Sequence, residues 1–361
     1  MSDPVSGRPV RKRPRRAGIG LVAAAALIWP AATPPAAAEP AATLLPLPFR
    51  VAQLRGPDSE VALAAATSGI GRPPPGGVAV AWGEEGGAIL TLDGGTIAVR
   101  PLAAEAIEAL AAGETPRGAV AGTRRALSGP VSAYLSGATS GGPDGQPGAA
   151  GLTVRERQPV PMSADPKPVP THTETVTPGA DAVFATAPVR AAQIDGGLHL
   201  LAVKLQGGGS SLALVGRDGA AWRVRAEIPA APGGLDAAAA DFAGTGRTSL
   251  ALLRGTPEGG RVEHWTVAGG KPVLAGTASG PFAGPGDVVA AADLDGDGAA
   301  ELVLPSRDRT ALVLVSARGE VRERARVALP APARSLAVLG SGRGARIVVG
   351  LADGRVAEVR P

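Results

Sequence analysis

A unit of about fifty residues recurs along the C-terminal half of the chain and constrains its fold more than any other feature. The clearest copy covers residues 287–329 and contains four short apolar runs separated by turn residues. Each run is too short for a stable helix, and its β-branched residues and Gly/Asp turns favour strands. Equivalent positions lie 48, 52 and 45 residues apart, at Gln193, Asp241, Asp293 and Val338. The repeat therefore predicts successive four-stranded units.

Four-stranded units at this period are typical of β-propeller blades. We expect an all-β chain in which residues 39–361 form one propeller domain. The repeats are clear over residues 181–361 and irregular over residues 49–158, and residues 159–180 carry six prolines that suggest an extended connector. The spacing predicts six blades, or seven if residues 100–185 contain two.

The last copy stops one strand short, at Pro361. Closed sheets are often completed by a strand from the other terminus, which removes exposed edges, and residues 49–54 are the expected closing strand. Other segments predict a first blade and a helix. The blade strands are expected at residues 61–66, 78–82, 88–92 and 96–99, and the helix at residues 102–112, where Ala, Leu and Glu dominate.

The first 38 residues have the three parts of a secretory signal: a basic stretch (residues 11–16), an apolar run (residues 17–29) and small residues ending at Ala38. We expect export to the periplasm or outside the cell, with cleavage after Ala38. An uncleaved anchor is the alternative, although the run is shorter than the ~20 residues of a spanning helix. Arg15 and Arg16 leave general and twin-arginine export both open.

Composition excludes several classes of function. The formal net charge is +4, but residues 1–38 hold six Lys/Arg against one Asp, so the remainder carries about −1 and has no basic domain for nucleic acid. With no cysteine, the chain has neither disulfides, thiolate zinc sites nor a thiol nucleophile. Only nine residues are aromatic (four Trp, four Phe and one Tyr), so stacking platforms for sugars or bases are scarce.

The clearest repeat contains an acidic loop of the kind that binds calcium. Carboxylates alternate along it, and Gly296 and Gly298 allow the backbone to wrap inward. Calcium takes six to eight oxygens from loops of this type. The predicted ligands are the side chains of Asp293, Asp295, Asp297 and Glu301 and the carbonyl of Ala299. A solvated acidic turn is the alternative reading.

This loop, with Phe282 and residues 284–287 ahead of it, resembles the calcium loops of FG-GAP/VCBS repeats, found in integrin-α-like propellers and many secreted bacterial proteins. The resemblance implies a propeller with such loops between the first two strands of a blade. In the neighbouring copy Asp241 remains, but Ala243 and Thr245 replace the next two carboxylates. We therefore expect one structural Ca²⁺.

The sequence offers no recognisable catalytic constellation. Residues 244–248 resemble the end of a phosphate-binding loop but lack its lysine, and the three histidines are scattered. We expect a monomeric, calcium-stabilised module that binds or scaffolds a protein or a cell-surface glycan, with no membrane span after signal cleavage. A lectin-like propeller and, less favoured, a propeller-fold lyase or hydrolase remain alternatives.

Overall fold

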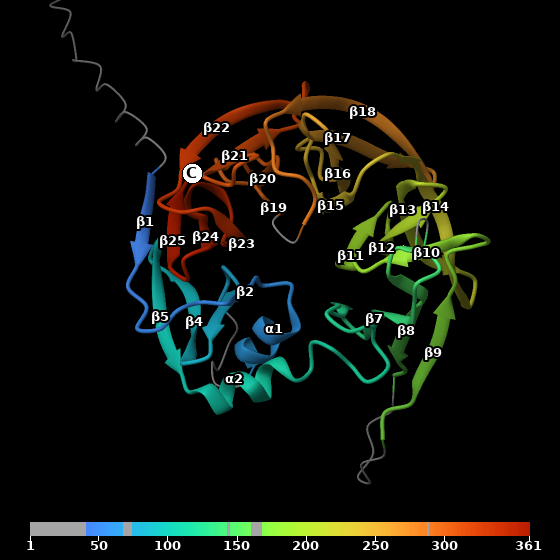
Figure 1. Ribbon diagram of the computed structural model, residues 1–361, viewed down its shortest axis with the longest axis horizontal. Helices are drawn as coiled ribbons and strands as arrows, with labels where there is room; N and C mark the ends of the chain where they lie inside the picture. Colours follow the sequence, from blue (N-terminus) through green and yellow to red (C-terminus); the bar gives the residue numbers. More distant parts are fainter. Residues whose placement is uncertain (1–40, 68–73, 143–144, 160–167, 287–288) are drawn as a thin grey trace, which may run out of the picture. The chain divides into compact units, whose positions relative to one another are not determined.

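Antiparallel sheets dominate the computed structural model, which describes residues 41–67, 74–142, 145–159, 168–286 and 289–361 (Figure 1). The prediction of an all-β fold is confirmed. The chain divides into two compact units, Met1–Ala38 and Glu39–Pro361, and every described residue lies in the second. The predicted signal segment falls outside the described residues. In the described part, no helix has the length and apolar character needed to cross a membrane.

Four sheets each contain four strands. Sheet I contains β2 (Gln53–Arg55), β3 (Val78–Gly83), β4 (Gly86–Asp93) and β5 (Thr96–Leu102). Sheet IV contains β15 (Leu235–Ala240), β16 (Ser249–Thr256), β17 (Gly259–Ala268) and β18 (Lys271–Gly280). Sheet V contains β19 (Ala290–Ala292), β20 (Glu301–Pro305), β21 (Ala311–Ser316) and β22 (Arg322–Ala328). Sheet VI contains β23 (Ala333–Leu339), β24 (Arg346–Leu351), β25 (Val356–Arg360) and β1 (Ala41–Leu45).

A fifth, nine-stranded sheet consists of two further four-stranded units and a bridging strand. Unit II contains β6 (Ala126–Ser128), β7 (Val131–Thr139), β8 (Gly148–Arg157) and β9 (Thr171–Val176). Unit III contains β11 (Arg190–Ile194), β12 (Gly197–Gln206), β13 (Gly209–Asp218) and β14 (Ala221–Ala231). The bridge is β10 (Ala182–Ala185), where Phe184 pairs with Ala149 of β8 and Lys204 of β12. The described residues thus contain six four-stranded units.

Strand alternation explains how the sheets pack. Successive side chains of a strand point to opposite faces. In β20, Leu302 and Leu304 enter an apolar cluster shared with sheet IV, whereas Val303 enters one shared with sheet VI. The middle strands are buried on both faces and read as continuous apolar runs. Sheet V is therefore enclosed by its two neighbours.

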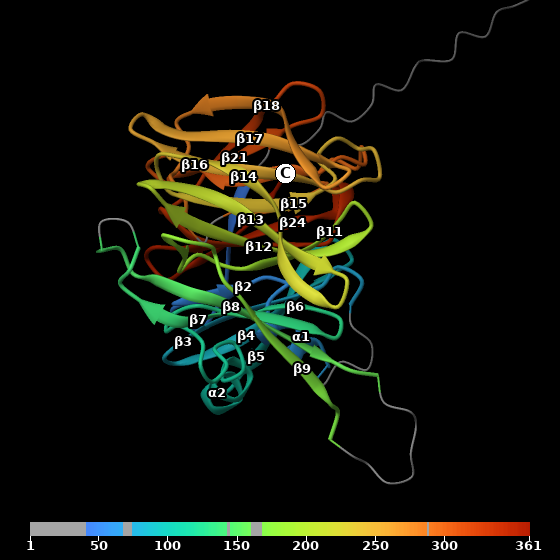
Figure 2. The same cartoon turned by 90° about the vertical axis from the view of Figure 1, so that its right-hand side faces the viewer.

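The units pack in chain order, and the last packs against the first. Apolar clusters join II to III, III to IV, IV to V, V to VI, and VI to I. Figure 1 shows the same succession, and Figure 2 shows strands of III and IV in neighbouring layers. Beside sheet I, a sixth cluster joins β3 and β4 to helices α1 (Glu60–Thr67) and α2 (Ala104–Ala111).

Two strand predictions for the N-terminal region are wrong. Residues 61–66 lie in α1, because an alanine-rich run follows Ser59, whose hydroxyl accepts a hydrogen bond from the N–H of Ala62 (3.3 Å). The strand that completes sheet VI is β1, where Thr43 pairs with Glu358, and residues 49–54 do not pair with β25. A strand from the N-terminal region does complete the sheet, but that strand is β1 and lies earlier in the chain than residues 49–54.

Two other predictions meet different outcomes. The helix expected over residues 102–112 is confirmed as α2. Residues 159–180 are not wholly an extended connector, since β9 lies within them and pairs with β8 from Thr171 to Val176. Its threonines occupy alternate positions and so share one face of the strand, and threonine favours strands, although prolines precede this segment.

Candidate functional site

The acidic loop connects β19 to β20, the first two strands of sheet V. Asp293, Asp295 and Asp297 each offer a carboxylate oxygen, and these oxygens lie within 4.8 Å of one another. Gly296 and Gly298 have φ values of 78° and 86°, which side-chain-bearing residues rarely adopt. The tight turns made by these glycines bring the three aspartates of the prediction together.

Backbone N–H groups hold the carboxylates in place. Asp293 accepts hydrogen bonds from the N–H groups of Gly296 (2.7 Å) and Gly298 (3.2 Å). Asp295 accepts one from the N–H of Asp297 (3.0 Å), and Asp297 accepts one from that of Ala299 (2.8 Å). The bond from Ala299 and the nearby guanidinium of Arg318 lower the pKa of Asp297. The loop therefore carries three preorganised oxygen donors.

Two arginines that the sequence analysis did not single out also contact this loop. Arg324, from β22, pairs with the carboxylates of Asp295 and Glu301. Arg318 pairs with Asp297, with a nitrogen–oxygen distance of 2.7 Å. Their approach depends on the hairpin between β21 and β22, so their spacing from the aspartates gives no local sequence signal. These guanidinium groups occupy oxygens that a metal ion would also use.

Glu301 lies beside the aspartate group, not in it. Its side chain is buried, with one oxygen accepting from the N–H of Leu294 (2.9 Å) and the other from Arg324 (2.9 Å). Burial raises the pKa of Glu301. Of the predicted ligands, the structure groups the three aspartates and places Glu301 at the adjoining end of β20, while Ala299 lies buried between them.

The equivalent loop of sheet IV shows what the first aspartate does without the others. Asp241 accepts from the N–H groups of Thr245 (3.0 Å) and Gly246 (2.5 Å), as Asp293 does in its own loop. Burial acts to raise the pKa of Asp241, but the surrounding N–H groups outweigh it and lower the pKa. Asp241 thus shapes the turn of its loop through backbone hydrogen bonds.

A cavity of about 590 Å³ is lined by the first strands of the six units, β2, β6, β11, β15, β19 and β23. Small residues such as Ala238, Ala239 and Ala291 form one part of its wall. Ion pairs cross the part near the helices, where Arg55 pairs with Glu114 (3.2 Å) and Arg125 with Glu60. The cavity thus combines a charged wall with an apolar one.

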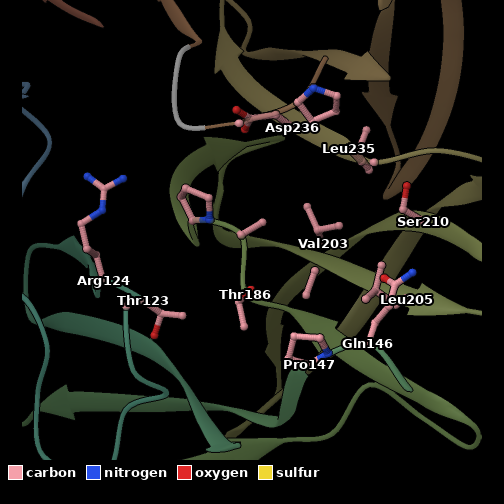
Figure 3. Close-up of a pocket in the computed structure, with 17 residues that line it drawn as sticks. Thr123, Arg124, Gln146, Pro147, Thr186, Val203, Leu205, Ser210, Leu235 and Asp236 are labelled. Carbon is pink, nitrogen blue, oxygen red and sulfur yellow. The ribbon is translucent and has the colours of Figure 1, made fainter. Parts of the chain in front are cut away.

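A second hollow of about 450 Å³ lies between β10, β12 and β15 (Figure 3). Val203, Leu205 and Leu235 face it, and Arg124 and Asp236 lie at its edge. Arg124 also lines the larger cavity, so the two hollows adjoin.

The histidines lie in three different strands, β9, β12 and β17. His264 is buried, contacts the hydroxyl of Ser249 through Nε2 (2.9 Å), and has its pKa lowered by burial. His199 contacts the carbonyl of Gly197 through Nδ1 (3.1 Å). Among the described residues, one group of three or more His, Asp or Glu side chains has ligand atoms close enough together to hold a metal ion. That group is the three aspartates of the acidic loop.

No family model matches the chain, and no curated protein matches it either.

Proposed function

We propose that the protein is an exported β-propeller of six four-stranded blades, stabilised by one calcium ion, that binds or scaffolds a protein partner. The packing of sheet VI against sheet I supports the propeller, since a series of blades closes when its last member meets its first. The pairing of β1 with β25 supports it too, because a strand from one terminus then completes the blade at the other.

The aspartate loop carries the proposal. Three carboxylates with oxygens within 4.8 Å of one another suit a hard divalent cation, and calcium prefers oxygen ligands. Asp293, Asp295 and Asp297 would hold the ion, with the carbonyl of Ala299 as the fourth ligand of the predicted set. Arg324 and Arg318 would withdraw as it binds, and both are about half exposed, so water can receive them.

Glu301 fits this set only if it exchanges Arg324 for the ion. Its carboxylate is tied to Leu294, which fixes it at the base of the loop. The ion would then act as a pin between the β19–β20 turn and the buried strand that starts at Glu301. Its role would be to stabilise the loop geometry.

The surfaces that the units leave exposed support the proposal of a binding partner. The faces of the middle strands are buried against neighbouring units, so the connecting loops and the exposed outermost strands, such as β18, are left to contact other molecules. A loop whose shape depends on calcium would make such contacts calcium-dependent.

A capture experiment tests this function. Immobilised residues 39–361 are incubated with periplasmic extract of the native host in millimolar calcium or in chelator, beside an Asp295→Ala variant. We expect a partner that is retained with calcium and lost with chelator or with the variant. Asp353→Ala, in a hairpin turn of sheet VI, is the matched control and should retain it. Equal recovery of all proteins in calcium and chelator would contradict a calcium-dependent binding role.

Export is tested separately. The intact mass of the protein recovered from the native host should place the N-terminus at Glu39 or within a few residues of it. A full-length mass in the membrane fraction would instead indicate an anchor.

A further inference from the structure

Strand β18 forms the outer edge of sheet IV. It pairs with β17 from Lys271 to Gly280, and within the described residues β17 is its one hydrogen-bonded neighbour. Figures 1 and 2 show β18 on the outside of β17. Neighbouring units flank the strand, since it contacts β14 of unit III and its Gly276 lies against Val321, just before β22 of sheet V. The backbone edge of β18 is therefore the part that stays free to pair.

This free edge is apolar and almost without charge. Among the described residues, five large apolar side chains are exposed, and two of them, Val273 and Leu274, are consecutive in β18. The strand has ten residues, and Lys271 is the charged one, so residues 272–280 carry no charge. An exposed, uncharged edge of this length is a template for pairing with a further strand.

The other outer strands carry charges or are short. Charged side chains interrupt four of them, and β1, the fifth, is uncharged but has five residues. A charge on an edge strand opposes pairing with a further strand. β14 and β22 contain a bulge, as β18 does, but β18 is the one of these three without a charge after its first residue. The interrupting residues are Arg100 of β5, Glu174 of β9, Arg223, Arg225 and Glu227 of β14, and Arg322, Glu323, Arg324 and Arg326 of β22.

A second copy of β18 suits this edge. In an antiparallel pair about a two-fold axis, the same strand supplies both sides of the seam. With full overlap of the ten residues, Lys271 lies opposite Gly280 and Leu274 lies opposite Thr277. The two lysines of such a pair then lie at opposite ends. Uncharged side chains face each other along the rest of the seam, so no like charges oppose the pairing.

The charges near the ends of β18 agree with this partner. The Gly280 end meets the β16–β17 hairpin, where Glu258 and Arg307 are exposed and Arg307 donates to the carbonyl of Glu258 (2.8 Å). Their side-chain charges offset each other, so Lys271 of a second copy would approach no net charge. The same overlap of β22 with itself would instead place Arg324 opposite Arg326, and like charges directly opposite are destabilising.

We propose that two copies of the protein form a symmetric dimer through antiparallel pairing of their β18 edges, with Leu274 of each copy opposite Thr277 of the other. Pairing would also shield Val273 and Leu274 from water. The dimer requires neither the calcium ion nor the protein partner proposed above. It differs from the monomer expected from the sequence, because a strand pattern does not show which edges remain free.

Analytical ultracentrifugation of residues 39–361 in chelator tests the dimer. We expect the average mass to rise from that of one chain towards that of two as the concentration increases from micromolar to submillimolar, because one strand pair makes a small and reversible interface. A mass that stays at one chain over this range would overturn the proposal. Growth beyond two chains would overturn it as well, since a two-fold pair of β18 edges is closed.

Charged variants test the seam and its register. Leu274→Lys and Thr277→Glu should each weaken dimerisation at least about tenfold, because every dimer then carries the unpaired charge twice in its seam. Both side chains are exposed, so each variant should melt like the parent protein in dilute solution. An equimolar mixture of the two variants should recover dimers, since the introduced lysine of one copy then faces the introduced glutamate of the other.

Leu44→Lys is the matched control, because it places the same charge on an exposed position of β1, the other uncharged edge. This variant should dimerise like the parent protein. Unchanged dimerisation of Leu274→Lys, loss of the dimer in Leu44→Lys, or no recovery in the mixture would each overturn the proposal.

Discussion

Aspartates in the loops between first and second strands have separable tasks. Asp293 and Asp241 each accept two backbone N–H groups and fix the turn, in loops that otherwise differ. Asp295 and Asp297 accept one N–H each and direct their second oxygen to an arginine. We infer that a bound cation would replace the arginine partners of Asp295 and Asp297.

Asp295→Ala should abolish the rise in melting temperature that calcium produces. An ion that binds only the folded loop stabilises by RT ln(1 + [L]/Kd), so 1 mM calcium should add about 0.4–1.4 kcal/mol if the Kd is about 10⁻⁴–10⁻³ M, as at sites of extracellular modules. Thermal melts with and without millimolar calcium measure the effect, and magnesium should give little. Asp241→Ala is the control and should lower the melting temperature while keeping the calcium response. An equal loss of response in both variants would contradict the assignment.

Arg324→Gln should increase calcium affinity about two- to fivefold. The guanidinium of Arg324 occupies the Asp295 and Glu301 carboxylates, and a partly exposed ion pair of this kind is worth up to about 1 kcal/mol. Calorimetric titration gives the affinity. Arg326→Gln, which removes a pair with Glu323 on the same strand, is the matched control and should leave the affinity unchanged. Weaker binding in Arg324→Gln would show that Arg324 supports the site.

Stability should fall below pH about 6.5 because of His264. Burial lowers the pKa of this side chain in the folded state, so the unfolded chain, whose histidine has a pKa near 6.5, binds more protons as the pH falls. The contribution is fully present above pH about 6.5 and is lost below it, by up to about 1.4 kcal/mol per pH unit. Urea unfolding at pH 7.5, 6.5 and 5.5 should show this slope, and His264→Gln should flatten it. An identical slope in the variant would contradict the assignment.

Single elements show which sequence signals decide the fold. The strands of unit III and of sheets IV to VI follow from the sequence, because apolar runs alternate with Gly and Asp turns at a fixed period. Gly207 and Gly208, for example, have φ values of 58° and 78°, as a two-residue hairpin turn requires. Helix α1 does not follow in the same way, since its alanine-rich run also suits a short buried strand. Its Ser59 cap was the available signal.

Long-range pairing is the part that local patterns do not determine. β1 has two alanines and lies just before a proline-rich stretch, and only its pairing with β25 makes it a strand. The same reason accounts for the site. The three aspartates lie at alternate positions of one short loop and could be predicted, whereas Arg324 reaches them through the β21–β22 hairpin.

Removing residues 39–46 should destabilise sheet VI. Without β1, the edge of β25 is exposed, and with it Ala357 and Val359 of that strand, which belong to a buried cluster. We expect a lower melting temperature and concentration-dependent aggregation in light scattering. Leu44→Lys keeps the strand and changes only an exposed side chain, so it should behave like the parent protein. A deletion variant that does not aggregate and melts unchanged would mean that β1 does not complete the sheet.

The six units are not joined alike. Apolar clusters join five successive pairs, including VI to I. Between I and II, helices α1 and α2 pack on sheet I, and ion pairs from Arg125 to Glu60 and from Arg55 to Glu114 line the cavity. Among the described residues, the pair of Arg125 with Glu60 links these two units, whereas an apolar cluster joins each of the other five pairs.

A crystal structure of residues 39–361 grown in millimolar calcium tests the central claim, a calcium-pinned propeller, most directly. The account predicts six four-stranded blades around the cavity, with β1 completing the last. It also predicts one ion bound by Asp293, Asp295 and Asp297, with Arg324 withdrawn from Asp295. Sheets I and VI lying apart, or an ion-free loop with Arg324 still on Asp295, would contradict it.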